Sequence, residues 1–171
     1  DTAETRDLAL AFNQMAGAIE RSTRELETRV RARTAELEQE RAHLHTLVAS
    51  IPDLIWLKDL DGIYLACNPT FERFFGASEA HIVGKTDHDF VDTELADSFR
   101  RKDLEALVAN QASVYEEWIT YADTGQRALL ETTKVPIRGP DGQVRGILGI
   151  GHDITDRNQA QEKLRLSAKV F

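Results

Sequence analysis

The sequence has a single cysteine, no long apolar run and a deficit of positive charge. One cysteine, Cys67, excludes a disulfide framework and is typical of a protein from a reducing compartment. No apolar run approaches the roughly 18 residues of a membrane-spanning helix, and no segment has the features of a signal peptide. Lys and Arg number 21 against 29 Asp and Glu, giving a net charge of −8, which argues against a nucleic-acid-binding surface.

Proline and glycine are nearly missing from the first third of the chain. Residues 1–51 contain no proline and only one glycine, Gly17, whereas the other nine glycines and all four prolines lie between Pro52 and Gly151. Both residue types destabilise a helix when they lie in its interior. The division therefore predicts a long helix followed by a domain of strands and turns.

Apolar residues in the first third recur with a period of seven. One column contains Ala9, Ala16, Thr23, Val30, Leu37, Leu44 and Ile51, and the other contains Phe12, Ile19, Leu26, Arg33, Glu40 and Leu47. These are the a and d columns of a coiled coil, and a lone helix of this length has little reason to stay folded, so we expect a parallel homodimer. Arg33 and Glu40 are polar at d positions; they are either tolerated substitutions or a weakened stretch that can rotate or splay.

Two segments of this helix resemble known signalling elements. Residues 7–15 (Asp-Leu-Ala-Leu-Ala-Phe-Asn-Gln-Met) resemble the end of the second helix of a HAMP domain, and residues 29–37 resemble the signalling-helix linker that commonly follows it. The resemblance implies that residues 1–20 end a HAMP domain and that residues 21–50 form a coiled-coil linker. It also implies a membrane-anchored parent protein, of which this piece begins on the cytoplasmic side.

The remainder of the chain has the pattern of a mixed domain. Pro52 ends the helix, and alternation and turn residues predict strands at 54–58, 63–67, 114–121, 128–137 and 144–152. Helices are expected at 70–75, 79–83, 94–109 with Thr93 as its N-cap, and 153–171. This order predicts an α+β domain, a five-stranded antiparallel sheet with helices on one face.

Several motifs in this domain resemble those of PAS domains, over residues 47–157. They are Lys58-Asp59-Leu60-Asp61-Gly62, Asn68-Pro69 with Phe71, Phe75-Gly76, residues 82–87 (Ile-Val-Gly-Lys-Thr-Asp) and Asp153-Ile154-Thr155-Asp156-Arg157. The resemblance implies a sensory and dimerisation module at residues 51–157, followed by a linker helix at 158–171. Residues 164–171 look like the linker that opens a further domain in bacterial cyclic-di-guanylate enzymes. The implied parent is a bacterial inner-membrane receptor, a sensor histidine kinase or a cyclic-di-guanylate cyclase or phosphodiesterase.

Alternation along the strands separates two faces of the sheet, and the resemblance to flavin-binding PAS domains sets which face meets the helices. The expected helix-facing residues are Trp56, Lys58, Trp118, Thr120, Leu130, Thr132, Lys134, Ile147, Gly149 and Gly151. Gly149 and Gly151 leave either room for a ligand or a close approach for a helix. The opposite face is also apolar, with Ile55, Leu57, Tyr115, Ile119, Tyr121, Leu129, Val135, Leu148 and Ile150. We expect a helix to cover it, most simply the coiled-coil end near Leu44, Leu47 and Val48.

Inward-facing lysines need partners, for which Asp87 and Glu116 are the candidates. One interpretation is that Lys58 and Lys134 form ion pairs at the rim or reach out to solvent. The other is a site for a small anionic ligand, made by Trp56, Lys58, Asp87, Trp118, Thr132 and Lys134.

Known cofactor chemistries have little support in the sequence. Asp87 stands where light-sensing PAS domains have a reactive cysteine, residues 93–109 contain no histidine for haem, and the spacing of His81 and His88 does not favour a metal. The cofactor, if any, is therefore unassigned. The sequence has no P-loop, nucleophile elbow, phosphoacceptor box or cyclase motif, so we expect no catalytic site.

Two functions remain open, a ligand sensor and a ligand-free relay between an upstream sensor and a downstream output domain. In both, the antiparallel strand order should bring residues 51–53 beside residues 153–155. Signals would then pass through Pro52, Asp153, Ile154 and Thr155. A packed interior favours the relay, and an open cavity favours the sensor.

Overall fold

A computed structural model describes residues 2–168. Its contacts divide the chain into a unit that ends at Leu47 and a unit that begins at Val48. Helix α1 (Thr2–Ser50) is continuous and has no buried residue. The apolar side chains of its a and d columns are exposed, including Phe12, Ile19, Leu26, Val30, Leu37, Leu44 and Leu47. The long N-terminal helix is thus confirmed, and its apolar seam has no cover within the described chain.

The second unit is built on a five-stranded antiparallel sheet, in the order β2-β1-β5-β4-β3. The strands are β1 (Leu54–Asp59), β2 (Tyr64–Cys67), β3 (Ser113–Thr120), β4 (Arg127–Arg138) and β5 (Val144–Asp153). Hairpins join β1 to β2, β3 to β4 and β4 to β5, whereas the pairing of β1 with β5 closes the sheet across the chain. This confirms the α+β class and places the first and last strands side by side.

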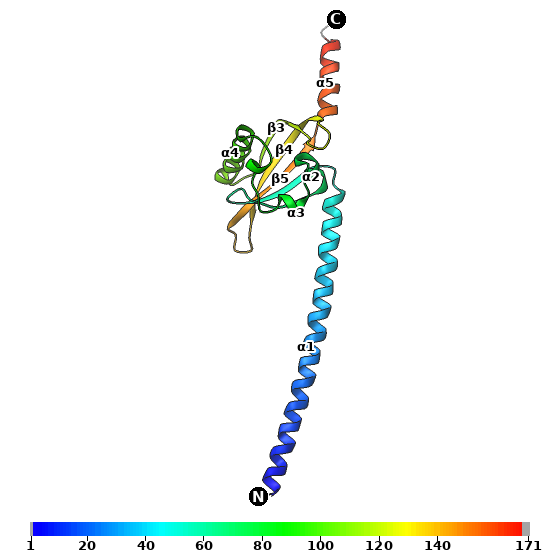
Figure 1. Cartoon of the computed structure of the whole chain (residues 1–171), viewed down its shortest axis with the longest axis vertical. Coiled ribbons are helices and arrows are strands. Elements are labelled where there is room, and N and C mark those ends of the chain that lie inside the picture. Colours follow the sequence, from blue (N-terminus) through cyan, green and yellow to red (C-terminus); the bar gives the residue numbers. More distant parts are fainter. Residues whose placement is uncertain (1, 169–171) are drawn as a thin grey trace. The chain divides into compact units, whose positions relative to one another are not determined.

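Most helices of the unit lie beside the strands, whereas the last one, α5, extends away from the end of the sheet (Figure 1). They are α2 (Pro69–Phe75), α3 (Glu79–Ile82), the short 3-10 helix η1 (Asp87–Asp89), α4 (Thr93–Ala109) and α5 (Thr155–Ala168). The Asn68 side chain caps α2 by accepting from the Phe71 amide at 3.1 Å, and Gly76 ends it with a φ of 66°.

Three local predictions need correction. Asp92, not Thr93, caps α4, because its carboxylate accepts the Leu95 amide at 3.0 Å. Helix η1 has no counterpart among the helices expected from the sequence. The last helix begins at Thr155, and the predicted end of that helix, residues 169–171, lies outside the described residues.

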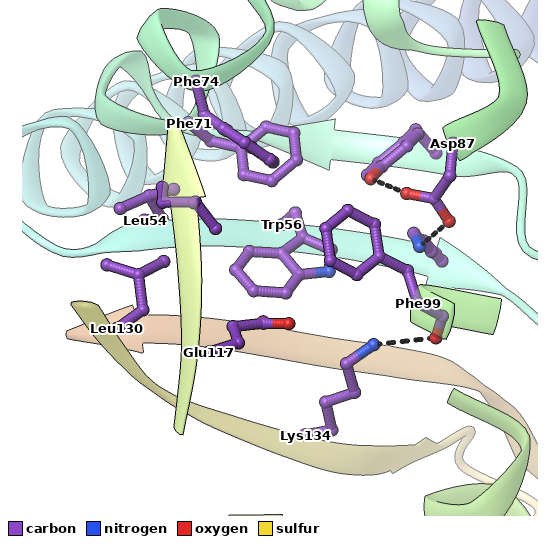
Figure 2. A pocket seen from close by; sticks show the side chains of 12 residues that line it. Leu54, Trp56, Phe71, Phe74, Asp87, Phe99, Glu117, Leu130 and Lys134 are labelled. Carbon is purple, nitrogen blue, oxygen red and sulfur yellow. Dashed lines mark hydrogen bonds and ion pairs between the residues drawn. The ribbon is translucent and has the colours of Figure 1, made fainter. Parts of the chain in front are cut away.

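The core lies between the sheet and helices α2 and α4. Phe71 of α2 is its centre, with ring centroids 5.1 Å from Trp56 and 5.4 Å from Tyr64. Phe74 and Phe99 complete the cluster from α2 and α4. Figure 2 shows Phe71, Phe74 and Phe99 around Trp56. The buried face of the sheet is therefore the one that carries Leu54, Trp56 and Lys58, as predicted for β1.

The predicted facing of β3 is wrong by one residue. Ile119 is 4% exposed and Trp118 is 46% exposed, so Trp118 lies on the outer face. Thr120 is exposed, while Tyr121, predicted to face outward, is buried. The reason is that this edge strand has polar and apolar residues on both faces, so alternation alone does not decide its phase. Ile55, Leu57, Val135, Leu148 and Ile150 remain on the outer face, half-buried.

Candidate functional site: a buried ion-pair network and a strand junction

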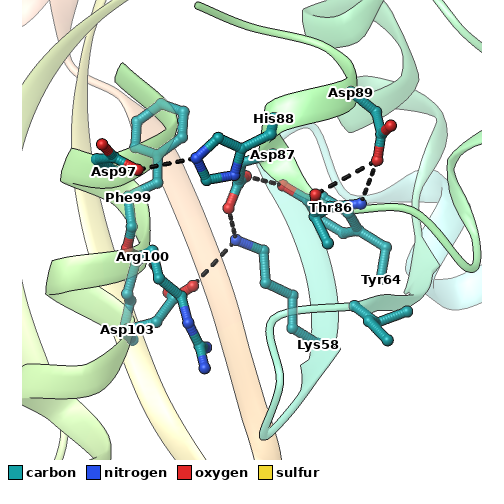
Figure 3. A network of polar contacts seen from close by, with 12 residues as sticks. Lys58, Tyr64, Thr86, Asp87, His88, Asp89, Asp97, Phe99, Arg100 and Asp103 are labelled. Atoms are coloured by element: carbon teal, nitrogen blue, oxygen red, sulfur yellow. Dashed lines mark hydrogen bonds and ion pairs between the residues drawn. The ribbon is translucent and has the colours of Figure 1, made fainter. Parts of the chain in front are cut away.

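The interior of the second unit contains a charged network centred on Lys58. The Lys58 side chain is 1% exposed, and its ammonium group lies 2.5 Å from Asp87 Oδ2 and 3.0 Å from Asp103 Oδ2. Asp87 comes from η1 and Asp103 from the buried face of α4. Figure 3 shows both carboxylates directed at the lysine. Two carboxylates offset the cost of burying this charge.

Lys134 extends the network from β4. Its ammonium group donates to Asp103 Oδ1 and to the Phe99 carbonyl, the latter at 3.2 Å (Figure 2). Burial lowers the pKa of Lys134, and the neighbouring Asp103 carboxylate acts in the opposite direction. We call Lys58, Asp87, Asp103 and Lys134 the buried ion-pair network. It holds β1, β4, η1 and α4 together.

Hydrogen bonds satisfy the remaining oxygens around the network. The Tyr64 hydroxyl donates to Asp87 Oδ1 at 2.6 Å, and burial together with Asp87 raises the pKa of Tyr64. Glu117 accepts from Thr132 Oγ1 at 2.9 Å and from Lys102 Nζ at 3.0 Å. The interior charges are thus paired with one another.

The structure corrects the predicted partners of the lysines. Asp87 contacts Lys58 as predicted, but Glu116 lies on the outer face of β3, and it is Glu117 that faces the interior. Asp103 was missed. A signal was available, because Asp103 follows Phe99 by four positions and so shares the buried face of α4.

The cavity beside the network is almost filled. Its volume is about 20 Å³, room for about one water molecule, and its lining includes Trp56, Lys58, Asp87, Glu117 and Lys134. A Cβ atom on Gly149 would lie 2.1 Å from Trp56 Cε2. The space left by Gly149 is therefore occupied by the Trp56 indole, rather than by a helix or a void.

Four of the six predicted ligand-binding residues line this cavity. Thr132 is buried nearby and reaches it through Glu117. Trp118 does not belong to the site, because its side chain lies on the outer face, where Arg127 is 4.5 Å from its ring centroid. A ligand role for the other five remains a prediction.

A second site lies where the chain enters and leaves the sheet. We call residues 52–54 together with residues 151–155 the junction. Leu54 pairs with Gly151, and the Asp53 carboxylate lies 2.7 Å from His152 Nδ1. The side-chain amide of Asn68 donates from Nδ2 to the backbone carbonyl of Asp53 at 2.8 Å. The incoming segment is thus bonded to both α2 and β5.

The outgoing side of the junction is equally well held. Asp153 Oδ1 accepts from the backbone amide of Thr155 at 2.9 Å and from its hydroxyl at 2.5 Å. The Thr155 hydroxyl oxygen accepts from the Leu129 amide at 2.9 Å, and the Ile154 amide donates to the Leu129 carbonyl. The start of α5 is therefore fixed to β4 by Asp153, Ile154 and Thr155. Pro52 is exposed at the other side.

The described residues show no sign of a reactive thiol, a metal site or a membrane-spanning helix. Burial, with Glu79 and Glu72 nearby, raises the pKa of the Cys67 thiol to about 12, so the thiol is protonated at neutral pH. Over residues 2–168, no group of three or more His, Cys, Asp or Glu side chains is placed to hold a metal ion. None of the helices described is both long and apolar enough to cross a membrane.

The five-stranded antiparallel sheet, its helical cover and the bonded junction define an α+β domain with the architecture of the PAS fold. The PAS fold family matches residues 48–159, and the chain belongs to this family.

Relatives in the family are signalling proteins. The chain is 30% identical over 132 residues to the aerobic respiration control sensor protein ArcB of Escherichia coli K12, covering 77% of this chain and 17% of ArcB. It is 29% identical over 123 residues to a diguanylate cyclase of Vibrio cholerae, covering 71% of this chain and 38% of the cyclase. The chain thus corresponds to a minor part of each relative, and no catalytic domain is seen in the residues described.

A solved structure shows the same fold. One chain of a Vibrio cholerae VqmA dimer structure superimposes with a TM-score of 0.62 at 22% identity, covering 68% of this chain and 52% of that chain. At this identity the likeness supports the fold alone.

Proposed function

We propose that the chain is a ligand-free relay in a bacterial membrane receptor. It joins a HAMP end (residues 1–20) and a coiled-coil linker (21–50) to a PAS domain (51–157) and an outgoing linker helix (158–171). The observation that carries the proposal is the junction, where hydrogen bonds join the segment after α1, strand β5 and the start of α5. Movement of one helix there can bias the other.

The interior supports a relay rather than a sensor. The cavity of about 20 Å³ is smaller than a small-molecule site, which is typically about 300 Å³ or more. The four charges of the buried ion-pair network also balance, two ammonium groups against two carboxylates. A bound ligand would have to displace Trp56 and break existing ion pairs.

The relay acts as a parallel homodimer formed through α1. Its exposed seam of Val30, Leu37 and Leu44 is the kind of surface that a second copy covers by knobs-into-holes packing. Arg33 pairs with Glu36 of its own helix at 2.8 Å, so its charge is partly compensated at a d position. Together with Glu40 it makes a stretch of weaker packing, where the two helices rotate or splay.

The relatives support a parent of the receptor class. We infer that this piece is the cytoplasmic portion of an inner-membrane receptor, and that α5 leads into a histidine kinase or a cyclic-di-guanylate enzyme. This rests on the likeness to ArcB and to the Vibrio cyclase, and on the resemblance of residues 7–15 to a HAMP helix and of residues 29–37 to a signalling helix.

A second candidate is sensing of a small anionic ligand. The observation that favours it is that Lys58 and Lys134 both line the cavity, beside Trp56. An anion there would compete with Asp87 and Asp103 for the two ammonium groups. A stoichiometric small anion that copurifies with the chain would favour this function over the relay.

Asp153→Ala tests the relay directly. The substitution removes the acceptor that holds Thr155, and loss of such a cap costs about 0.5–2 kcal/mol, which the fold tolerates. We expect output activity of the full-length parent to lose its response to input, while the circular dichroism spectrum of residues 1–171 is unchanged.

The matched control is Asp141→Ala. Asp141 accepts from the Gln143 amide at 3.1 Å in the same local geometry, but in the β4–β5 turn. A parent with Asp141→Ala should respond normally. A full response from the Asp153→Ala parent would contradict the relay.

A further inference from the structure

One ionisable pair at the junction has no part in the hydrogen-bonded backbone or in the buried network. His152 is the second-to-last residue of β5, and Asp53 directly follows Pro52. Their side chains meet at 2.7 Å, Nδ1 to Oδ1, across a separation of 99 residues. The pair therefore joins the incoming segment to the outgoing strand at the point where the proposed relay must act.

The surroundings of His152 are acidic. Glu131 is its register partner on β4, Glu116 lies opposite Glu131 on β3, and Asp153 follows it on β5. The hydrogen bond to Asp53 and the Asp53 charge raise the pKa of His152 above its ordinary value of 6.5, and Glu131 and Asp153 act in the same direction. The imidazole is thus placed to change charge within the physiological pH range.

We propose that His152 and Asp53 form a pH-sensitive clasp, which holds the incoming segment against β5 when His152 is protonated and weakens when His152 becomes neutral. The folded state favours the protonated imidazole, because the pKa of His152 is higher in the folded chain than in the unfolded chain. The stabilisation from the clasp is therefore complete at a pH below the unfolded-state pKa, and it is lost as the pH rises through the folded-state pKa. Alkalinisation then loosens the junction. The clasp adds an input to the proposed relay, and its failure leaves the relay itself untouched.

The site suits a switch better than a structural brace. Both side chains are accessible to solvent, so protons exchange freely and the energy of the pair is small enough to be reversed. The Asp53 backbone stays anchored by Asn68 whether or not the pair forms. The fold is therefore kept when the pair is lost, while the hydrogen bonds that flank Asp53 and His152 open more often.

Two measurements on the 1–171 chain test the clasp. NMR titration should give His152 a pKa above 6.5 that falls toward 6.5 in Asp53→Asn. Amide exchange should show protection factors of Ile55 and Ile154 about two- to fivefold higher at pH 6 than at pH 8. These amides donate to Asn68 Oδ1 and to the Leu129 carbonyl, two residues from Asp53 and His152 respectively.

The pH effect on exchange should disappear in Asp53→Asn and in His152→Gln. It should shrink in high salt, because the pair is exposed. The matched control is His88→Gln, which removes the His88–Asp97 pair at 2.8 Å, between η1 and α4. That variant should keep the full effect. A His152 pKa that is not raised above 6.5, or a pH effect on amide exchange that persists in His152→Gln, would overturn the proposal.

Discussion

Asp103→Leu lowers the free energy of unfolding by about 3–5 kcal/mol, the cost of removing one member of a buried ion pair. Asp103 is fully buried and accepts from both Lys58 and Lys134. Without it, Lys58 keeps Asp87, but Lys134 keeps only the Phe99 carbonyl, so a buried ammonium group lacks a counter-charge. Urea unfolding of the 1–171 chain, followed by circular dichroism, measures this loss.

Two further variants show whether the loss comes from the stranded charge. Asp97→Leu changes an exposed aspartate on the same helix and should alter stability by less than about 1 kcal/mol. Adding Lys134→Met to Asp103→Leu removes the stranded ammonium group, so the double variant should be more stable than Asp103→Leu alone. A double variant that is less stable than both single variants would show that charge pairing is not the cause.

Gly149→Ala lowers the free energy of unfolding by about 3 kcal/mol, at the upper end for overpacking by one methyl group. Its Cβ atom would overlap the Trp56 indole, with 2.1 Å to Cε2 and 2.2 Å to Cζ2. The indole is held against Phe71 and cannot retreat without disturbing the aromatic core. The same urea titration measures the change.

Gly151→Ala is the matched control on the same strand and face. Its Cβ atom would meet the end of the Leu130 side chain at 3.0 Å, which can yield, so we expect a loss below about 1 kcal/mol. Combining Gly149→Ala with Trp56→Leu should cost less than the sum of the single losses, because the smaller side chain removes the overlap. Equal losses for Gly149→Ala and Gly151→Ala would contradict the assignment of the Gly149 space to Trp56.

Local sequence pattern predicts much of this fold, because most helices and strands have the residue periodicity and the terminal residues typical of their type. Alternation placed Trp56, Lys58, Thr132 and Lys134 on the buried face, where the structure has them. The order of the strands was enough to bring residues 51–53 beside residues 153–155. These results depend on period-two geometry, on the phase taken from the resemblance to flavin-binding PAS domains, and on chain connectivity.

The failures share a physical cause, which is competition that local sequence cannot resolve. In β3, Trp118 and Ile119 are adjacent apolar residues, and tertiary packing chose Ile119 for the core. Asp92 and Thr93 are both competent caps, and Asp92 was selected. Asp103 pairs with Lys58 at a separation of 45 residues, which no helix-face pattern specifies. The phase taken from flavin-binding relatives did not hold for this edge strand.

Native mass spectrometry of the purified 1–171 chain tests the proposed ligand-free dimeric relay most directly. The account predicts a species with the mass of two 19.2 kDa chains and no added small molecule. A single-chain species at micromolar concentration would contradict the dimer formed by α1. A dimer that carries a stoichiometric small molecule would contradict the ligand-free interior and favour the anionic-ligand sensor.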